Sequence, residues 1–270
     1  MKKVLASLGL SLIVVSGVFA DTLMMATTTS TEDTGLLDSL APKFEKETGT
    51  TLKWVSTGTG KALKMGENCD VDVLLVHAPE AEKKFIEAGF GVDRNEVMYN
   101  DFVIIGPKND PAKVSGKTTA EAFKAIKEKN ANFLSRGDNS GTHQKELSMW
   151  EKVNKIVPEK DTWYIQTGQG MIATINMASE KSGYTLTDRG TWIKYESQKG
   201  DSNNMKIVVE NDNILFNQYS VITVNKDRCP NVKTQLAKDF TNWIIKDETQ
   251  KFIGNFKLLE KPLFTPNAKK

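Results

Sequence analysis

Three loops of this chain share one local pattern, in which a short apolar strand is followed by hydroxyl residues and glycine and then by a helical segment. The loops are residues 27–30, 56–60 and 135–142. Strands that alternate with helices of this length favour βαβ units and a mostly parallel sheet. Ligands of open α/β sheets collect beyond the carboxyl ends of the strands, where helix N-termini offer N–H groups. The pattern therefore predicts an α/β fold with one anion site built from all three loops.

The third loop is the richest of the three in hydrogen-bond donors. It carries Arg136, whose planar guanidinium matches an oxyanion, together with the hydroxyls of Ser140 and Thr142. We expect Arg136 to be the sole strong cation of the site. A carboxylate that faces a bound anion is unfavourable, so we expect Asp138 to orient Arg136 or to cap a backbone N–H.

Apolar periodicity predicts further elements outside the loops. A helix begins at Leu36 and ends near Gly49, and Pro42 inside it predicts a kink or a break. Residues 214–224 are typical of a strand, and residues 232–252 are typical of one long amphipathic helix. No internal repeat, low-complexity segment or flexible linker interrupts the pattern.

Residues 1–20 have the pattern of a secretory signal peptide. Lys2 and Lys3 form a basic start, an apolar stretch follows, and small residues precede Asp21. We expect cleavage after Ala20, which leaves an exported chain without a lipid anchor. Cleavage removes two of the 36 basic residues and none of the 34 acidic ones, so the mature chain is formally neutral. A neutral chain with no basic tract is a poor candidate for binding nucleic acid or an anionic membrane.

The chain has two cysteines, Cys69 and Cys229. An exported protein can pair them, but a mature chain of about 250 residues buries a core large enough to fold without such a bond. Their spacing matches no disulfide framework. The sequence therefore leaves both a disulfide and two free thiols open.

The chain lacks residues that three functional motifs require: a phosphate-binding loop, the nucleophile elbow of a serine hydrolase and the zinc-binding helix of a protease. The second loop is similar to part of a phosphate-binding loop, but Val55 and Ala62 stand where that motif needs Gly and Ser or Thr. A serine hydrolase elbow needs Gly two residues before the nucleophile, whereas Asp138 stands two residues before Ser140. His143 lacks the second histidine of a zinc-protease helix. We expect no enzyme and no metal ligands. A secreted hydrolase that uses Ser140 and His143 is the alternative from another class.

Six motifs of the chain resemble those of the periplasmic tungstate-binding proteins of ABC transporters. They are ATTTST at residues 26–31, STGTG at 56–60, DVLLVHAP at 72–79, SRGDNSGTH at 135–143, GQGM at 168–171 and YTLTDRGTW at 184–192. Together they run from the start of the mature chain to Trp192, which makes the resemblance specific. Short loops of threonine and serine alone would not make it specific.

The resemblance implies the fold of a type II periplasmic solute-binding protein. In this α/β fold two lobes are joined by two crossing strands, and the ligand lies in the cleft between the lobes. Residues 102–105 and 219–224 fit the two crossings. The domains implied are a signal peptide at residues 1–20, lobe I at residues 21–105 and 214–270, and lobe II at residues 106–213.

The resemblance also implies which residues hold tungstate, which is bound as the oxyanion through its oxygens. The residues carried over by motif are Thr27, Thr28 and Ser30 from the first loop, Ser56 and Thr57 from the second, and Arg136, Ser140 and Thr142 from the opposite lobe. Thr185 is a further candidate. Which threonine of residues 27–29 makes the contact stays open.

The function implied is that of a periplasmic receptor, expected to be a monomer, that delivers tungstate to the membrane permease of its ABC transporter without catalysis or a cofactor. The alternative is the same fold with molybdate or another tetrahedral oxyanion, phosphate or sulfate. Tungstate and molybdate have almost the same size and charge, so the sequence does not separate them. A lining of donors without a carboxylate acceptor would disfavour protonated phosphate.

Overall fold

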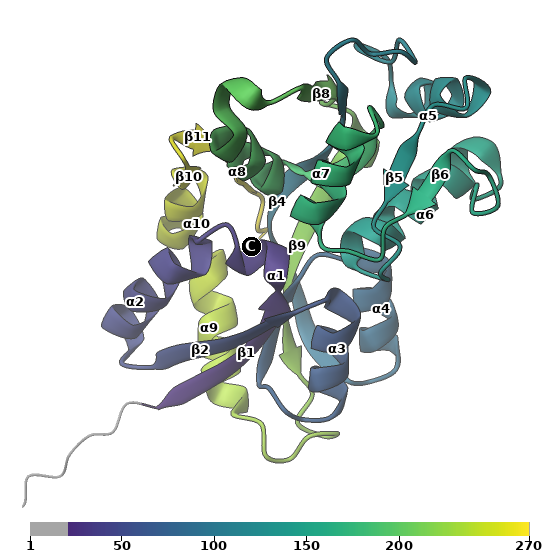
Figure 1. The fold of residues 1–270 in the computed structure, drawn as a ribbon. Coiled ribbons are helices and arrows are strands. Elements are labelled where there is room, and N and C mark those ends of the chain that lie inside the picture. The colour runs from purple at the N-terminus through teal and green to yellow at the C-terminus, as the bar shows by residue number, and fades with distance from the viewer. Residues whose placement is uncertain (1–20, 270) are drawn as a thin grey trace, which may run out of the picture.

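The computed structural model describes residues 21–269, so the predicted signal peptide at residues 1–20 lies outside the described residues. The chain forms two groups of strands, each covered by helices on both faces (Figure 1). The strands of the larger group lie in the order β12-β4-β9-β3-β1-β2. Their bounds are β1 Thr22–Thr28, β2 Thr51–Thr57, β3 Val73–Val76, β4 Gly91–Pro107, β9 Phe216–Val224 and β12 Thr265–Pro266.

The sheet is mixed, so the prediction of a mostly parallel sheet was wrong. Strands β1, β2 and β3 are parallel to one another, as βαβ units require. Strand β9 is antiparallel to both β3 and β4. The difference arises because β4 and β9 belong to the connections between the two halves of the molecule rather than to successive βαβ units.

Strand β4 changes partners part of the way along its length. Asp101 pairs with Phe216 of β9, and the next residue, Phe102, pairs with Asp188 of β7. The change precedes residue 105, where the sequence analysis put the end of the first segment of lobe I. The return connection runs through a short 3-10 helix, η2 (Asn213–Leu215), directly into β9.

The smaller group holds the remaining longer strands. Strands β7 (Thr185–Asp188) and β8 (Met205–Val209) pair antiparallel with β4, while β5 (Phe133–Ser135) pairs parallel with β6 (Tyr164–Gln166). We call the larger group with its helices lobe I and the smaller one lobe II. The short strands β10 (Lys257–Leu258) and β11 (Lys261–Pro262) pair with each other near the C-terminus.

Ten α-helices of the described chain complete the lobes. Those of lobe I are α1 Thr29–Glu32, α2 Leu36–Thr48, α3 Thr59–Glu67, α4 Pro79–Glu87, α9 Thr234–Ile245 and α10 Asp247–Gly254. Those of lobe II are α5 Thr119–Glu128, α6 Gly141–Asn154, α7 Met171–Glu180 and α8 Arg189–Lys199, which is followed by the 3-10 helix η1 Gly200–Ser202. No helix within residues 21–269 is long and apolar enough to cross a membrane.

The structure bears on two sequence predictions about helices: the kink or break expected at Pro42 is not a break, and the single helix expected over residues 232–252 is wrong. Helix α2 runs through Pro42 without a break, because the Asp38 carbonyl that loses its partner lies on the exposed side of the helix, where water can replace it. The helix predicted over residues 232–252 is two helices, because Lys246 is extended with φ −70° and ψ 151°. Asp247 and Glu248 then begin α10, where acidic side chains favour a helix N-terminus.

A disulfide bond joins Cys69 to Cys229, and their Cα atoms lie 5.3 Å apart. It ties the segment after α3 to the segment after β9, at a sequence separation of 160 residues. The structure thus settles the state of the two thiols that the sequence left open. Closure of so long a loop restricts the unfolded chain and stabilises the fold.

Candidate functional site

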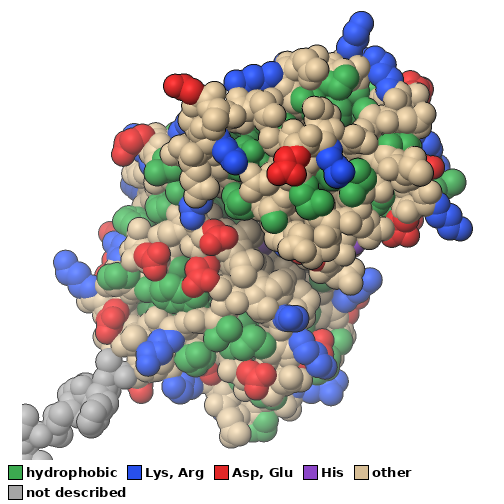
Figure 2. Space-filling model, in the orientation of Figure 1, with side chains coloured by type: hydrophobic (Ala, Val, Ile, Leu, Met, Phe, Trp, Pro, Cys, Tyr) green, Lys and Arg blue, Asp and Glu red, His purple; other side chains and the backbone are tan. Residues whose placement is uncertain are grey.

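A cavity of about 440 Å³ lies where the loops that follow β1, β2 and β5 meet. Two of these loops belong to lobe I and the third to lobe II. Figure 2 shows the surface hollowed between the upper and lower parts of the molecule. The lining residues are Thr28, Thr29, Ser30, Thr57, Gly58, Thr59, Gly60, Lys61, His77, Arg136, Asp138, Asn139, Ser140, Gly141, Thr142 and Gln144.

Six of the eight predicted site residues line this cavity, and the structure brings all three loops together there. The six are Thr28, Ser30, Thr57, Arg136, Ser140 and Thr142. Thr27 does not line it, because its hydroxyl donates to the Leu75 carbonyl at 2.8 Å within the sheet. Ser56 does not line it either, because its hydroxyl donates to the Glu32 carboxylate. Thr185 is buried and donates to the carbonyl of Leu134.

His77, at the end of β3, forms part of the cavity wall and orders the first loop. Its Nδ1 lies 2.9 Å from Asn217 Oδ1, and Asn217 Nδ2 donates to Asn100 Oδ1 at 2.8 Å. Since the amide NH₂ of Asn217 is used in this way, its oxygen accepts and His77 Nδ1 donates. Burial lowers the pKa of His77 to about 4, so the ring is neutral and its Nε2 is an acceptor.

The acceptor on His77 orders the hydroxyls of the first loop. Its Nε2 lies 3.0 Å from Thr28 Oγ1 and 3.2 Å from Ser30 Oγ, so the shorter contact favours Thr28 as the donor. Thr28 Oγ1 also accepts from the Thr31 N–H at the start of α1, and Thr31 Oγ1 lies 2.6 Å away. In this arrangement Thr31 donates to Thr28 and Thr28 donates to His77. Ser30 Oγ lies 3.1 Å from Thr28 Oγ1 and 3.2 Å from His77 Nε2, so its hydroxyl can donate to either atom or, after rotation, to an oxyanion in the cavity that it lines.

The second loop leads into α3, which begins at the cavity. Gly58 precedes the helix without a side-chain cap, and Thr59 is its first residue. The amides of this first turn therefore have no partner within the helix. Lys61 also lines the cavity. The expectation that Arg136 is the sole strong cation of the site was therefore wrong.

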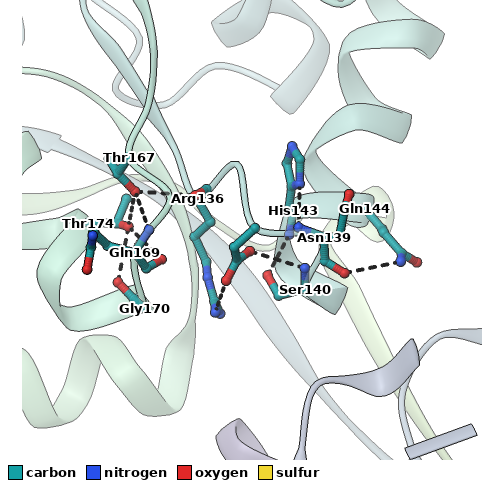
Figure 3. Close-up of polar contacts among 10 residues, drawn as sticks. Arg136, Asn139, Ser140, His143, Gln144, Thr167, Gln169, Gly170 and Thr174 are labelled. Carbon is teal, nitrogen blue, oxygen red and sulfur yellow. Dashed lines mark hydrogen bonds and ion pairs between the residues drawn. The ribbon is translucent and has the colours of Figure 1, made fainter. Parts of the chain in front are cut away.

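The third loop presents Arg136 and Ser140 (Figure 3), and Asp138 of the same loop also lines the cavity. Arg136 Nη2 lies 2.5 Å from Asp138 Oδ2, and Asp138 Oδ1 accepts from the Ser140 N–H at 3.1 Å. Both roles predicted for Asp138 are thus confirmed. Burial alone would raise the pKa of Asp138, but hydrogen bonds from Ser140 and the charge of Arg136 hold it below its usual value. Arg136 Nε is buried and has no partner among the described residues.

The presence of Asp138 in the cavity wall corrects the expectation of a lining without a carboxylate. Its two oxygens are already engaged by Arg136 and Ser140, so the carboxylate presents reduced negative charge to the cavity. The loop that holds it depends on Gly137, whose φ is +61°. A Cβ atom there would come within 2.8 Å of the Gln166 side chain.

A buried carboxylate lies directly behind the third loop. Glu146 of α6 is 2% exposed and accepts hydrogen bonds from Ser135 at the loop start, from Trp150 and from Tyr164. Burial raises the pKa of Glu146 to about 7. Through Ser135 this network fixes the point at which the loop leaves β5.

The geometry does not assemble a serine hydrolase from Ser140 and His143. Ser140 Oγ accepts from the backbone N–H of His143 and so caps α6. The His143 ring accepts the Asn139 N–H at Nδ1 over 3.0 Å, and it extends in the opposite direction to the Arg136 side chain (Figure 3). A nucleophile needs its base within hydrogen-bond reach, and no Ser140–His143 side-chain bond is present in the described chain.

Several lining residues were missed by the sequence analysis, although most lie within the motifs it used. Thr59 and Gly60 belong to the second loop, and Asn139 and Gly141 belong to the third. His77 lies within the motif at residues 72–79 but was not among the site residues that the motifs implied. A polar residue at the carboxyl end of a buried strand of an α/β sheet was the signal that could have placed it in the site.

The chain has close relatives among known proteins. Residues 20–248 match the family model of a PBP superfamily domain. The tungstate-binding protein TupA of Campylobacter jejuni subsp. jejuni is 54% identical over 240 residues, which cover 89% of each chain. The solved structure of the tungstate-binding protein TupA from Desulfovibrio alaskensis G20 is 62% identical with a TM-score of 0.87, covering 93% of this chain and 100% of that one. The solved structure described as the tungstate ABC transporter from Geobacter sulfurreducens is 48% identical with a TM-score of 0.76, covering 87% of this chain and 98% of that one.

Proposed function

This chain belongs to the PBP superfamily and, within it, to the family of tungstate-binding proteins, and we propose that its interlobe cavity binds tungstate for an ABC transporter. The protein is a receptor and not an enzyme. It passes the ion to the membrane permease of that transporter. No cofactor takes part, because the oxyanion is the cargo.

The observation that carries this proposal is that residues with hydrogen-bond donors from both lobes line one cavity. Arg136 Nε has no partner within residues 21–269, and the hydroxyl residues Ser30, Thr57 and Thr142 line the same cavity. The first turns of α3 and α6 begin at the same cavity and add backbone N–H groups. A small anion with four oxygens satisfies such a set of donors.

The balance of charge in the lining fits a dianion that is held mainly by dipoles. Arg136 and Lys61 are cationic, Asp138 is anionic, and the pKa of His77 keeps that ring neutral. The formal charges therefore sum to less than a dianion carries. Neutral N–H and O–H donors supply the remainder, and they act more strongly when the closed lobes exclude water.

We assign the side-chain contacts to the lining residues whose side chains do not cap a helix. The side chains assigned are those of Ser30, Thr57, Arg136 and Thr142, while Thr28 and Ser140 shape the loops as helix caps. Thr27 and Ser56 are not assigned a side-chain contact, because their hydroxyl hydrogens are used by Leu75 and Glu32.

Three further statements belong to the same proposal. The protein is exported to the periplasm after cleavage behind Ala20, and it acts as a monomer. Its lobes follow the division set out from the sequence, lobe I at residues 21–105 and 214–270 and lobe II at residues 106–213, except that the crossing strands change lobe next to the pair Asp101 and Phe216. The change of partner in β4 supports a first boundary between Asp101 and Phe102.

Isothermal titration of residues 21–270 with tungstate, molybdate, sulfate and phosphate tests the proposal. Tungstate is expected to bind with a dissociation constant of nanomolar order, about −12 kcal/mol. Molybdate is the nearest competitor, because its size and charge are almost the same. Tight binding of phosphate or sulfate without heat from tungstate would contradict the assignment.

A further inference from the structure

Thr59 carries a buried hydroxyl that the fold leaves without a partner. The residue is 2% exposed, and its Oγ1 forms no hydrogen bond to any described residue. A buried hydroxyl without a partner destabilises a protein. Thr59 nevertheless lines the interlobe cavity, as the first residue of α3. The hydroxyl therefore has a polar environment only when something in the cavity accepts its hydrogen.

This hydroxyl lies where the two lobes approach each other at the cavity. A Cβ atom built on Gly141, the first residue of α6 in lobe II, would lie 3.2 Å from Thr59 Oγ1. The same Cβ would lie 3.6 Å from Cε1 of His77 in lobe I. Two helix N-termini from opposite lobes thus converge on Thr59 Oγ1.

The positive dipole ends of two helices lie at Thr59 Oγ1, which has no acceptor within hydrogen-bond distance among the described residues. The first turns of α3 and α6 present backbone N–H groups, and Lys61 follows two residues later along the chain. A hydroxyl in such a place can donate only to an acceptor that enters the cavity. An oxyanion supplies that acceptor and is itself favoured by the two helix ends.

We propose that Thr59 donates its hydroxyl hydrogen to an oxygen of the bound oxyanion at the contact between the lobes. This inference rests on the proposed function, since it assigns a further binding residue to the same site. Gly141 leaves the space in which the lobes can close around that contact. Thr59 was not among the binding residues that the motifs had indicated.

Two substitutions separate the hydroxyl from the shape of the side chain. Thr59→Val removes the hydroxyl and keeps the branched shape, whereas Thr59→Ser keeps the hydroxyl. Titration of each purified variant of residues 21–270 with sodium tungstate gives the dissociation constant, and thermal melting without the ion gives Tm. A hydrogen bond to a charged acceptor corresponds to a loss of about 10- to 100-fold in affinity for Thr59→Val. We expect Thr59→Ser to bind within about threefold of the wild type.

The melting temperature of the ion-free protein distinguishes a binding role of Thr59 from a structural role. If the hydroxyl stabilised the fold, Thr59→Val would melt at a lower temperature than the wild type. Because the hydroxyl has no partner without the ion, Thr59→Val should melt at the same temperature as the wild type or higher. Unchanged affinity in Thr59→Val, or an equal loss in Thr59→Ser, would overturn the proposal. A lower Tm of Thr59→Val with unchanged affinity would show that the hydroxyl has a partner within the protein. Absence of tungstate binding by the wild type would instead reject the proposed function.

Discussion

His77 Nδ1 lies 2.9 Å from Oδ1 of Asn217, and this contact ties the wall of the cavity to strand β9. Asn217 in turn pairs with Asn100 of β4, next to the residues at which the chain passes between the lobes. His77 thus connects the first loop of the site to both strands at that passage. The hydrogen bond that His77 Nε2 accepts from the first loop requires a neutral ring, which burial favours by lowering the pKa of His77 to about 4.

Replacement of His77 by glutamine should weaken the acid sensitivity of the fold. The unfolded chain takes up a proton on His77 as the pH falls through 6.5, whereas the folded protein does so only near pH 4. Stability is therefore lost as the pH falls across this window. Between pH 7.5 and 5.0 the wild type should lose about 2 kcal/mol more than His77→Gln, measured by urea unfolding at both values. Equal losses in the two proteins would show that His77 titrates normally.

Replacement of Glu146 by glutamine should remove a loss of stability that the wild type shows as the pH rises. Burial raises the pKa of Glu146 from 4.5 to about 7, so the folded state holds a proton that the unfolded state releases. Stability is then lost as the pH rises from 4.5 through 7. Between pH 5.0 and 8.0 the wild type should lose about 2–3 kcal/mol that Glu146→Gln does not lose, measured by urea unfolding.

Glutamine is a suitable replacement at residue 146 because it preserves the three contacts. Its oxygen can accept from Trp150 and Tyr164, and its NH₂ can donate to Ser135. A variant that is less stable than the wild type at pH 8.0 would mean that the carboxylate is ionised and stabilising in the fold.

Replacement of Arg136 by alanine should abolish tight tungstate binding and leave the apo protein folded. The variant removes the only guanidinium of the lining and leaves Asp138 without its cation. We expect affinity to fall by at least about 100-fold, because charge-assisted hydrogen bonds to an oxyanion are lost. The apo Tm should change by no more than about 2 °C, since the ion pair with Asp138 is partly exposed. Retained affinity in titration calorimetry would mean that the site is misplaced.

Replacement of Gly141 by alanine should hinder closure of the lobes. Its φ does not lie in the left-handed region, so alanine fits the start of α6. The added Cβ would approach Thr59 Oγ1 to 3.2 Å, which requires the lobes to stay slightly apart. An overpacked contact of this kind corresponds to roughly a 10-fold loss of tungstate affinity. We expect this loss as faster dissociation in stopped-flow measurements.

Gly170→Ala is the matched control for this experiment. Gly170 precedes α7 with a φ of −63°, and a Cβ atom there would meet nothing within 4 Å. Its tungstate dissociation rate should equal that of the wild type. Equal rates in Gly141→Ala would show that the contact between the lobes is looser in the bound state.

The sequence predicted local elements well where one physical signal was strong. The apolar face of α2 and its end at Gly49 were read from periodicity and from the left-handed conformation that glycine accepts. The direction of β4 and β9 was not predicted, because antiparallel pairing depends on how distant segments cross. Lys246 split the last predicted helix for the same reason, since Glu47 of α2 fixes its side chain at 2.5 Å.

The site was predictable in its loops and less so in its individual side chains. The spacing of hydroxyl residues and glycines identified all three loops that meet at the cavity. The spacing did not show that the hydroxyls of Thr27 and Ser56 donate hydrogen bonds to Leu75 and Glu32, because those partners come from other elements. Whether a polar group is satisfied is a property of the packed fold, so the free hydroxyl of Thr59 was also beyond a reading of the sequence.

The pairing of Asp101 with Phe216 has a consequence for how this molecule can be rebuilt. Neighbouring antiparallel residues lie about 5 Å apart, so the chain enters and leaves lobe II at almost one point. The whole of residues 102–215 therefore occupies the position of a hairpin turn. A two-residue turn such as Asn-Gly could in principle replace it and join β4 to β9 directly. The same junction is also a place at which lobe II could be exchanged for another domain while lobe I is kept.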